Sequence, residues 1–480
     1  MYSAQQITNK GHNIYASGFP NDIRTVYQSG TGTVINPSSS YSQRSYLSQM
    51  GRINYSFDSR YLLTLTARRD GYSAFGDNNK FGVFPSAALG WNLHNERFME
   101  NVDWLSQMKL RASYGLNGNQ AISPYSTLPS LYGQHYMDQN HQAAIGYRPA
   151  GLGDPTLGWE SAKVFNFGLD FGFLDNRLRG TFEIFDRTTY DLLLSKSISP
   201  INGTTSITQN IGEVDGRGFE LQISSINFDT PNFEWRTDLN LTRSKNEIVH
   251  VGLTGEDGEY IDDVASRWFI GKEINVNYGY KLAGIWQEGD DIENSHMPDA
   301  EPGDIRVADT DGDGELTEED RTIIGTPDPD FTFGLNKEFS LNNISLRFFI
   351  YGVEGSTKLN PLIPSQTDFV DWNMRRRSLD IDYWEPDDPS NRFPANRDNV
   401  NPYGVNYYED ASYIRLQELT LSYNFPNTVI SGWGLNSLRL YVNAKNLATW
   451  TEWKGLDPEF SSQLSQPLTR IFLFGINVGL

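Results

Sequence analysis

The stretch FNFGLDFGF, residues 165–173, alternates large apolar residues with small or polar ones. Successive side chains of an extended strand point to opposite faces, so its four phenylalanines and its leucine share one face. Asn166, Gly168, Asp170 and Gly172 fall on the opposite face. The stretch therefore predicts a β-strand with one apolar and one polar side.

The same pattern returns along the chain from about residue 44 onward. Roughly ten alternating residues are followed each time by a turn or loop that is rich in Gly, Asn, Asp and Pro. Further examples lie at 178–184, 219–223, 235–241 and 438–443. The alternation predicts about 14 strands and hardly any helix.

The composition limits the class of protein. With 13% aromatic residues, 43 Gly, no Cys and 38% hydrophobic residues, the chain is too aromatic to be disordered and too polar for a helical membrane protein. It has no continuous apolar run of the length that a transmembrane helix needs, whereas a transmembrane strand needs only about ten alternating residues. A formal net charge of −21 argues against nucleic acid as a partner, because phosphate binding needs clustered Lys and Arg.

Alternation by itself also fits a soluble β-sandwich, and the loop lengths separate the two folds. The tight connections are 57–60, 175–177 and 341–343, and the long ones are 117–159, 188–216 and 354–411. An outer-membrane barrel has short turns at one end and long loops at the other, which a sandwich has no reason to have. The sequence therefore favours an all-β, antiparallel transmembrane β-barrel.

Strand direction adds a further constraint. Neighbouring antiparallel strands run in opposite directions. Counting forward from the turn at 57–60 and backward from the C-terminus gives inconsistent directions for the strands that flank 250–330. An extra strand within 267–287 would restore the alternation and raise the number from about 14 to about 15 strands, which is odd. A complete bacterial single-chain barrel has an even number of strands, so further strands are expected upstream.

Seven segments resemble one known family in both wording and order. They are GRINYSFDSRYLLTLTARRDGYSAFG (51–76), KFGVFPSAALGWNLHNERFM (80–99), LRASYGLNGNQ (110–120), WESAKVFNFGLDFGF (159–173), NIGEVDGRGFEL (210–221), DASYIRLQELTLSYNFP (410–426) and YVNAKNLATWTEWKGLDPE (441–459). They are similar to strands of the SusC-like (SusC/RagA) family of TonB-linked outer-membrane transporters. The resemblance implies a barrel of about 22 strands with a plug domain in its lumen.

On this resemblance, residues 44–480 correspond to the C-terminal part of a TonB-dependent receptor barrel, and 1–43 to an extracellular loop or entry segment. The plug domain and the N-terminal strands would be absent from this chain. The resemblance implies a non-enzymatic role in the cell outer membrane, which is the uptake of a bulky glycan or peptide fragment. It also implies lipid around the barrel, a SusD-like surface lipoprotein as partner, and energy coupling to TonB. Two alternatives stay open: a secreted glycan-binding β-sandwich, and a truncated transporter fragment without its own function.

The segment DTDGDGELTEED at 309–320 has the spacing of an EF-hand-type calcium loop. The candidate ligands are Asp309, Asp311, Asp313, Asp320 and the backbone carbonyl of Glu315, with Gly314 at the sharp turn. Clustered oxygen ligands suit Ca²⁺, although Asp320 replaces the usual Glu, as in dockerin-like loops. The alternative is a solvated acidic turn without metal. A bound calcium would stiffen the loop rather than activate water, because no base or nucleophile is placed beside it.

An enzyme finds little support in the sequence. Its six His residues show no metal-ligand spacing, and neither a G-x-S-x-G motif nor a phosphate-binding Gly loop is present. The carboxylate pairs, such as Asp290 with Asp291, are adjacent residues in predicted loops, where a solvated surface is the ordinary role. We therefore predict no catalytic residues.

Aromatic residues suggest two further roles. The tryptophans close to predicted strand ends are expected to form interface girdles: Trp91, Trp159, Trp235, Trp286, Trp433 and Trp450. Candidates for contacting a ligand or partner are the loop residues Tyr125, Tyr132, Tyr136, Trp372, Tyr383, Trp384, Arg392 and Phe393. The last four lie in YWEPDDPSNRFPAN (383–396), whose prolines limit flexibility. The alternative role of this segment is to pack the loop onto the barrel rim.

Overall fold

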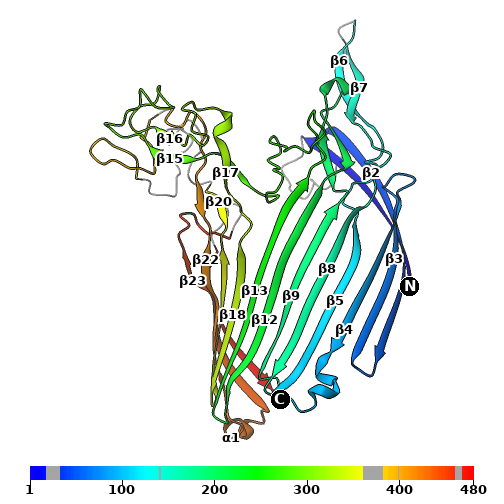
Figure 1. Cartoon of the computed structure of the whole chain (residues 1–480), viewed down its shortest axis with the longest axis vertical. Helices are drawn as coiled ribbons and strands as arrows, with labels where there is room; N and C mark the ends of the chain where they lie inside the picture. Colours follow the sequence, from blue (N-terminus) through cyan, green and yellow to red (C-terminus); the bar gives the residue numbers. More distant parts are fainter. Residues whose placement is uncertain (18–32, 140–141, 361–381, 398, 460–467) are drawn as a thin grey trace.

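The computed structural model describes residues 1–17, 33–139, 142–360, 382–397, 399–459 and 468–480. Its main feature is one sheet of 14 strands, here called the wall, in which neighbouring strands run antiparallel and lie side by side (Figure 1). In sheet order the strands are β1 (Tyr2–Ser17), β2 (Thr33–Phe57), β3 (Tyr61–Tyr72), β4 (Phe81–Asn92), β5 (Leu105–Asn119), β8 (Glu160–Phe173), β9 (Leu178–Tyr190), β12 (Glu213–Asp229), β13 (Phe233–His250), β18 (Phe331–Leu341), β19 (Ile344–Glu354), β22 (Tyr413–Asn424), β23 (Ser437–Thr451) and β24 (Ile471–Gly479).

The wall agrees with the predicted barrel and excludes the sandwich. A sandwich consists of two packed sheets, whereas these 14 strands form a single sheet. The number of strands lies within the predicted 14–15. The strands β1 and β24 are its two edges, and within the described ranges no pairing joins them.

The short connections lie at one end of the wall, which we call the short-turn end. At the first of them, the Arg60 N–H donates to the Phe57 carbonyl at 2.9 Å, while Asp58 and Ser59 have φ of 51° and 53°. Positive φ at both central residues is the geometry of a type I′ turn, which matches the twist of paired strands. The other two predicted tight connections, after β8 and β18, lie at this same end.

The long connections gather at the opposite end, the long-loop end (Figure 1). They follow β5, β9, β13 and β19, and each returns to the strand next in the sheet order. The predicted separation of short turns from long loops is therefore confirmed.

The prediction of an extra wall strand within 267–287 is wrong. This stretch contains β14 (Asn277–Tyr280) and β15 (Leu282–Ile285), which pair with β17 (Arg321–Gly325) and β16 (Ile305–Val307) outside the wall. Because β13 pairs directly with β18, the wall alternates in direction without another strand. Short strands inside a loop carry the same sequence pattern as wall strands, so the pattern did not separate them.

The expectation that 1–43 form an extracellular loop is also corrected. These residues contain β1 and the beginning of β2, and the two strands pair with Tyr2 opposite Gln49 and Thr8 opposite Gln43. The N-terminal sequence places polar residues on both faces of the strand, so it lacks the alternation that reveals a strand. Backbone pairing with β2 makes it a strand nonetheless.

The remaining regular elements are short. The other two-stranded sheets are β6 (Ser130–Met137) with β7 (Ala143–Gly151), β10 (Leu193–Ser197) with β11 (Ser206–Asn210), and β20 (Thr357–Leu359) with β21 (Tyr408–Asp410). The helical turns are η3 (Leu93–Asn95), η4 (Arg97–Met99), η5 (Pro200–Asn202), η6 (Glu318–Asp320), α1 (Asn427–Ile430) and η8 (Ser431–Trp433). No helix among the described residues has the length and apolar character needed to cross a bilayer.

The two faces of the wall differ in polarity. Pairing of β8 with β9 places Phe167 opposite Ile184 and Leu169 opposite Phe182, so the apolar side chains of neighbouring strands share one face. Phe165 on this face is 45% exposed. We call the apolar side the outer face and the polar side the inner face. Exposed apolar residues outside and polar residues inside are the arrangement of a barrel in lipid, as predicted.

Two long loops fold together at the long-loop end into a unit with its own core (Figure 1). This loop unit consists of residues 277–325, 382–397 and 399–411. Its buried core residues are Ile285, Trp286, Met297, Ile305, Val307, Trp384, Ala395, Val400, Val405 and Tyr407. The loop unit is therefore packed like a small water-soluble domain.

Candidate functional site

Ion pairs tie neighbouring strands together on the inner face. The Arg111 guanidinium on β5 donates through Nη2 to Asp170 Oδ1 on β8 at 3.0 Å, and reaches Glu183 Oε2 on β9 at 3.3 Å. The Thr181 hydroxyl also donates to Asp170 Oδ1, at 3.3 Å. One arginine thus connects three adjacent strands at a single level of the wall.

Polar contacts continue along the inner face toward β23. Asn336 Nδ2 donates to Asp238 Oδ2 at 3.1 Å, and Arg347 Nε donates to Asn336 Oδ1 at 2.9 Å. Further along, Asn443 Nδ2 donates to Thr420 Oγ1 at 2.7 Å. The inner face from β5 to β23 therefore presents paired charges and hydrogen-bonding groups, which suit a water-filled path.

The sequence did not single out Arg111, Asp170 or Glu183 as a group. Arg111 is separated from Asp170 by 59 residues and from Glu183 by 72. Their contact depends on the register of β5, β8 and β9, which is known only once the strands are paired. Alternation predicted that Asp170 and Glu183 lie on the polar faces of their strands, but it contained no signal for their pairing with Arg111.

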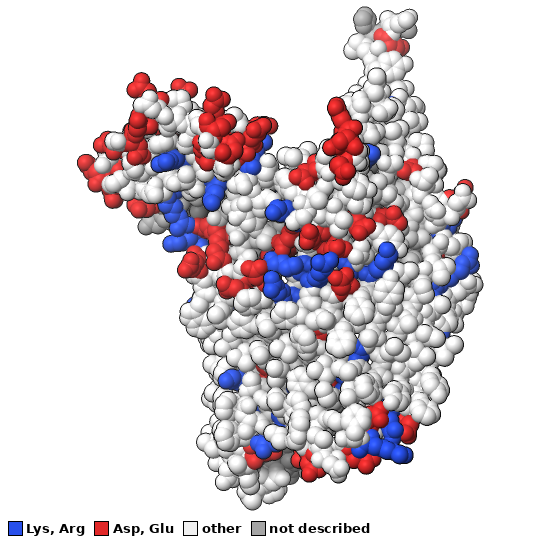
Figure 2. All heavy atoms as spheres, in the orientation of Figure 1, with Lys and Arg blue, Asp and Glu red and all other residues white. Residues whose placement is uncertain are grey.

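The outer face carries a band of charge near the long-loop end. Arg217 Nε on β12 lies 2.9 Å from Asp186 Oδ2 on β9, and Lys245 Nζ on β13 lies 2.7 Å from Glu273 Oε1 and 3.0 Å from Asp330 Oδ1. Figure 2 shows a band of mixed charge across the wall at the base of the long loops, and below it a broad zone with few charges. Such a zone is what the hydrocarbon layer of a bilayer requires.

Two of the expected girdle tryptophans lie on the outer face at the short-turn end. Trp91 stacks on Tyr61 with ring centroids 6.4 Å apart, and Trp235 stacks between Phe228 and Phe339. These positions fit an interface girdle.

The other expected girdle residues are divided. Trp433 and Trp450 are exposed beside wall strands, where they also fit a girdle. Trp286 is buried in the core of the loop unit, and Trp159 packs against Phe84 at 5.4 Å beside a cavity of the inner face. Proximity to a strand end in the sequence does not specify which side of the barrel a tryptophan occupies.

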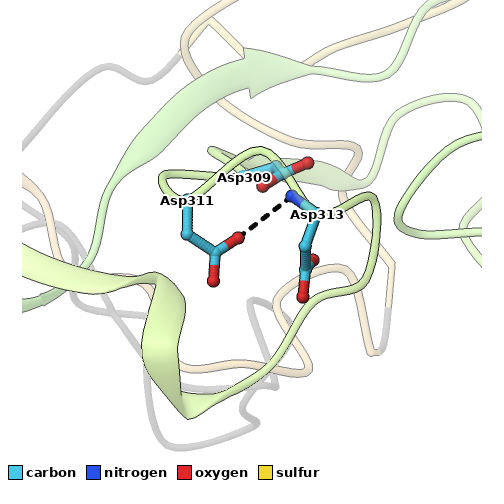
Figure 3. A group of neighbouring side chains, drawn as sticks. All are labelled: Asp309, Asp311 and Asp313. Carbon is cyan, nitrogen blue, oxygen red and sulfur yellow. Dashed lines mark hydrogen bonds between the residues drawn. The ribbon is translucent and has the colours of Figure 1, made fainter.

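The acidic loop brings together three of its predicted metal ligands (Figure 3). One carboxylate oxygen from each of Asp309, Asp311 and Asp313 lies within 4.8 Å of the others. Backbone N–H groups hold the side chains in place: Gly312 donates to Asp309 Oδ1 at 2.7 Å, and Asp313 donates to Asp311 Oδ1 at 3.1 Å. Clustered carboxylates of this kind fit a hard cation such as Ca²⁺.

Asp320 lies outside that group of carboxylates. It is fully buried, and its two oxygens accept from the backbone N–H groups of Thr310 at 2.7 Å and Thr317 at 2.9 Å. Its carboxylate thus closes the loop and caps η6. The Glu315 N–H donates to Asp313 Oδ1 at 2.8 Å, which places Glu315 beside the cluster.

The predicted ligand or partner residues of 383–396 mostly pack inside the loop unit. Trp384 is 7% exposed and its Nε1 donates to Gln287 Oε1 at 2.8 Å, while Tyr383 and Phe393 are half-buried against the same core. Arg392 pairs with Glu409. These residues pack within the loop unit itself, whereas the alternative that the sequence left open was packing onto the barrel rim. The remaining candidate, Trp372, lies outside the described residues.

The aromatic residues of the 117–159 loop are placed differently. Hairpin β6–β7 projects farthest from the wall at the long-loop end (Figure 1). Tyr132 and Tyr136 on it are exposed, as are Ile145 and Tyr147 on its second strand. These exposed aromatic side chains leave the hairpin accessible as a contact surface.

The antiparallel wall, its apolar outer face and its long loops at one end are features of an outer-membrane barrel. Comparison with known proteins identifies the family of this barrel. The family described as TonB dependent receptor-like, beta-barrel matches residues 3–447. The chain belongs to this family. Barrels of this family lie in the outer membrane and are not enzymes, which confirms the location and the non-enzymatic class that the sequence predicted.

Individual relatives agree with the SusC-like resemblance. TonB-dependent receptor P3 of Formosa agariphila is 34% identical over 470 residues, which cover 95% of this chain and 46% of that protein. TonB-dependent receptor SusC of Bacteroides thetaiotaomicron is 28% identical over 459 residues, covering 91% of this chain and 44% of that protein. The chain spans about half the length of the curated relatives it matches.

A solved structure gives the same assignment. The RagAB peptide importer in its open-open state superposes with a TM-score of 0.81 at 25% identity, covering 100% of this chain and 52% of that one. The RagA-like barrel wall that the sequence predicted is confirmed.

Proposed function

We propose that this chain forms the barrel wall of a transporter that imports a bulky nutrient, a glycan or peptide fragment, with energy supplied through TonB. The observation that carries the proposal is the inner face, where Arg111, Asp170 and Glu183 begin a set of polar contacts that continues to β23. A hydrated inner surface behind an apolar outer face gives a polar solute a route across the hydrocarbon layer. The similarity to the RagAB peptide importer supports the same function.

Uptake by cells tests this proposal. The full-length protein is expressed in a strain from which its gene has been deleted, and the cells receive labelled oligosaccharides and labelled peptides. We expect saturable accumulation of one of these, and its loss when a protonophore removes the proton gradient. Absence of accumulation for every compound, or accumulation that persists with the protonophore, would contradict TonB-coupled import.

We further propose that a SusD-like surface lipoprotein covers the long-loop end and contacts the hairpin β6–β7. Tyr132, Tyr136 and Tyr147 on this hairpin are 56%, 57% and 73% exposed. Exposed aromatic side chains are the residue type that most often anchors protein interfaces. The loop unit, whose aromatic residues are largely used in its own core, contributes a rigid neighbour.

Copurification measures this contact. Replacing the three hairpin tyrosines by Ser should reduce recovery of the lipoprotein with the tagged full-length barrel. The control replaces Tyr260, which is similarly exposed at 52% and lies in another loop, by Ser. Equal recovery with the hairpin variant and the control would exclude the hairpin as the contact.

A third proposal concerns the acidic loop, where Asp309, Asp311 and Asp313 would hold a calcium ion. The convergence of their oxygens within 4.8 Å favours this role, and Glu315 stands beside them to add a backbone carbonyl. The ion would offset the repulsion of three carboxylates and stiffen the loop. Asp320 would act through its hydrogen bonds to Thr310 and Thr317.

Calorimetry with calcium alone tests this site in the full-length protein. We expect Asp311→Asn to weaken calcium binding, while Asp291→Asn, which changes an acidic residue of another turn, should leave it unchanged. Identical calcium binding by the two variants would show that the loop is a solvated acidic turn.

A further inference from the structure

A cavity of about 580 Å³ opens on the inner face near the long-loop end, among β1–β5 and the residue that precedes β8. Pairing of β2 with β3 places Tyr46 and Ser48 opposite Tyr72 and Asp70, on the side away from the exposed outer residue Ile53. The cavity therefore lies on the route that a solute would take, at the end where the solute enters.

The cavity is lined by aromatic side chains that are held rigidly. Tyr46 stacks on Tyr72 with ring centroids 4.9 Å apart and planes 8° apart. Trp159 packs against Phe84 at 5.4 Å, and its Nε1 donates to the Lys80 carbonyl at 3.3 Å. Rings fixed in this way offer a preformed apolar surface, so a ligand loses little entropy in ordering them.

The charges in the cavity compensate one another. Arg68 Nε lies 2.6 Å from Asp70 Oδ2, and the Ser48 hydroxyl donates to Asp70 Oδ1 at 2.5 Å. Asp70 is 9% exposed, so its charge is already neutralised by its neighbours. No other charged residue lines the cavity within the described part of the chain. A charged ligand would thus lose hydration without gaining an uncompensated partner.

The lining of the cavity also offers free amides, from β1 at one edge and from the end of β5 at the other. The side chains of Gln5, Asn117 and Gln120 line the cavity, and none of them hydrogen-bonds to a residue that the structure describes. An amide presents a donor and an acceptor side by side. A hydroxyl group, which both donates and accepts, is the ligand group that satisfies such a pair most completely.

We propose that this cavity is a binding subsite for a neutral oligosaccharide, in which the apolar face of a sugar ring packs on an aromatic side chain and the sugar hydroxyls bind the amides. The inference rests on the proposed import function and narrows its substrate class. Apolar walls with a few polar groups that fix orientation are the usual construction of a ligand site. A peptide fits less well, because its charged ends and side chains find no free charge here.

Calorimetry on the full-length protein in detergent tests the subsite. The probes are malto-, cello-, xylo- and manno-oligosaccharides, oligogalacturonate as an acidic sugar, and hexapeptides. Asn117→Ala removes one amide and should weaken binding of a neutral sugar about tenfold. Asn117→Trp fills the cavity and should reduce binding further. The matched control is Asn240→Ala, which changes an exposed asparagine on another wall strand.

Binding of a neutral oligosaccharide that both Asn117 variants weaken and the control leaves unchanged supports the subsite. The subsite is overturned if no neutral sugar binds, if the Asn117 variants bind it normally, or if they weaken only a peptide or oligogalacturonate. Uptake by cells separates the subsite proposal from the transport proposal. Normal import by the Asn117→Trp variant would contradict the subsite proposal alone. Absence of import by the unsubstituted protein would contradict the transport proposal.

Discussion

The wall and the loop unit place the same residue types in opposite positions. On the outer face of the wall, Phe165 is 45% exposed and the polar contacts of Arg111 lie on the other side of the sheet. In the loop unit, Val307 is fully buried, while Asp311 and Asp313 are exposed. One chain therefore folds against two solvents. Burial of apolar groups is favourable where water is the alternative, whereas lipid tails accept the same groups at the surface.

The largest expected effect is in the loop unit. Trp384→Ala removes a buried indole and its hydrogen bond to Gln287, which should cost about 3–5 kcal/mol of the stability of this unit. Hydrogen exchange should rise at β15 and β16 while β8 and β9 stay protected. Trp450→Ala, at a 57% exposed position of the wall, is the control and should change exchange little. Equal exchange in the two variants would mean that the loop unit has no stabilising core.

Charge on the outer face should have the next largest effect. Leu221→Arg places a cation on the lipid side of β12 and should cost about 2–4 kcal/mol if it lies near the bilayer centre. Gln222→Arg, one residue later on the inner face, should cost less because its side chain meets water. Urea unfolding of the full-length protein in lipid vesicles compares them. A larger loss for Gln222→Arg would reverse the assignment of the two faces.

A smaller effect is expected from the buried carboxylate of the acidic loop. Asp320→Asn replaces one acceptor oxygen by an N–H₂ group that faces a backbone donor, at Thr310 or Thr317, and should cost about 1–3 kcal/mol locally. Asp313→Asn, at an exposed position of the same loop, should cost less in the absence of calcium. Hydrogen exchange of 309–320 in calcium-free buffer distinguishes them. Equal protection would show that the two Asp320 hydrogen bonds do not hold the loop.

The smallest effect concerns pH and a contact between two long loops. Burial raises the pKa of Asp154, but hydrogen bonds from the Thr156 hydroxyl, the Thr156 N–H and Gln209 outweigh it, so the pKa is lower than the ordinary value. A depressed pKa stabilises the fold at neutral pH, and this contribution disappears as the pH falls through the folded pKa. We expect exchange in 152–158 to rise below about pH 4. In the Asp154→Asn variant, the rise of exchange in 152–158 at low pH should vanish. A rise that persists in this variant would come from the titration of another group.

Much of the wall was predictable because alternation reports the environment of each side chain directly. FNFGLDFGF specifies a strand with one apolar face, and the tight turn at 57–60 and the long loop at 117–159 specify which ends of the strands are near each other. By contrast, β1 was missed because both of its faces mix polar and apolar residues. A strand that lacks a periodic pattern is recognised only through its hydrogen-bonded neighbour.

The candidate sites were predicted less completely, and for a related reason. The DxDxDG spacing was enough to bring Asp309, Asp311 and Asp313 together, because their distance apart is set by a few residues of local backbone. The aromatic content of 383–396 was not enough to assign the role of this segment. A tryptophan that packs in a core, as Trp384 does, and a tryptophan that binds a partner look alike in sequence.

By itself, the sequence determined that this protein is an antiparallel barrel wall with lipid on one side, because side-chain alternation and loop length are local properties. Only the tertiary structure decided that Arg111 meets Asp170 and Glu183, that the segments of the loop unit share a core, and that Tyr46, Asn117 and Trp159 surround one cavity. These groups are far apart along the chain, and the register of paired strands is what brings them together.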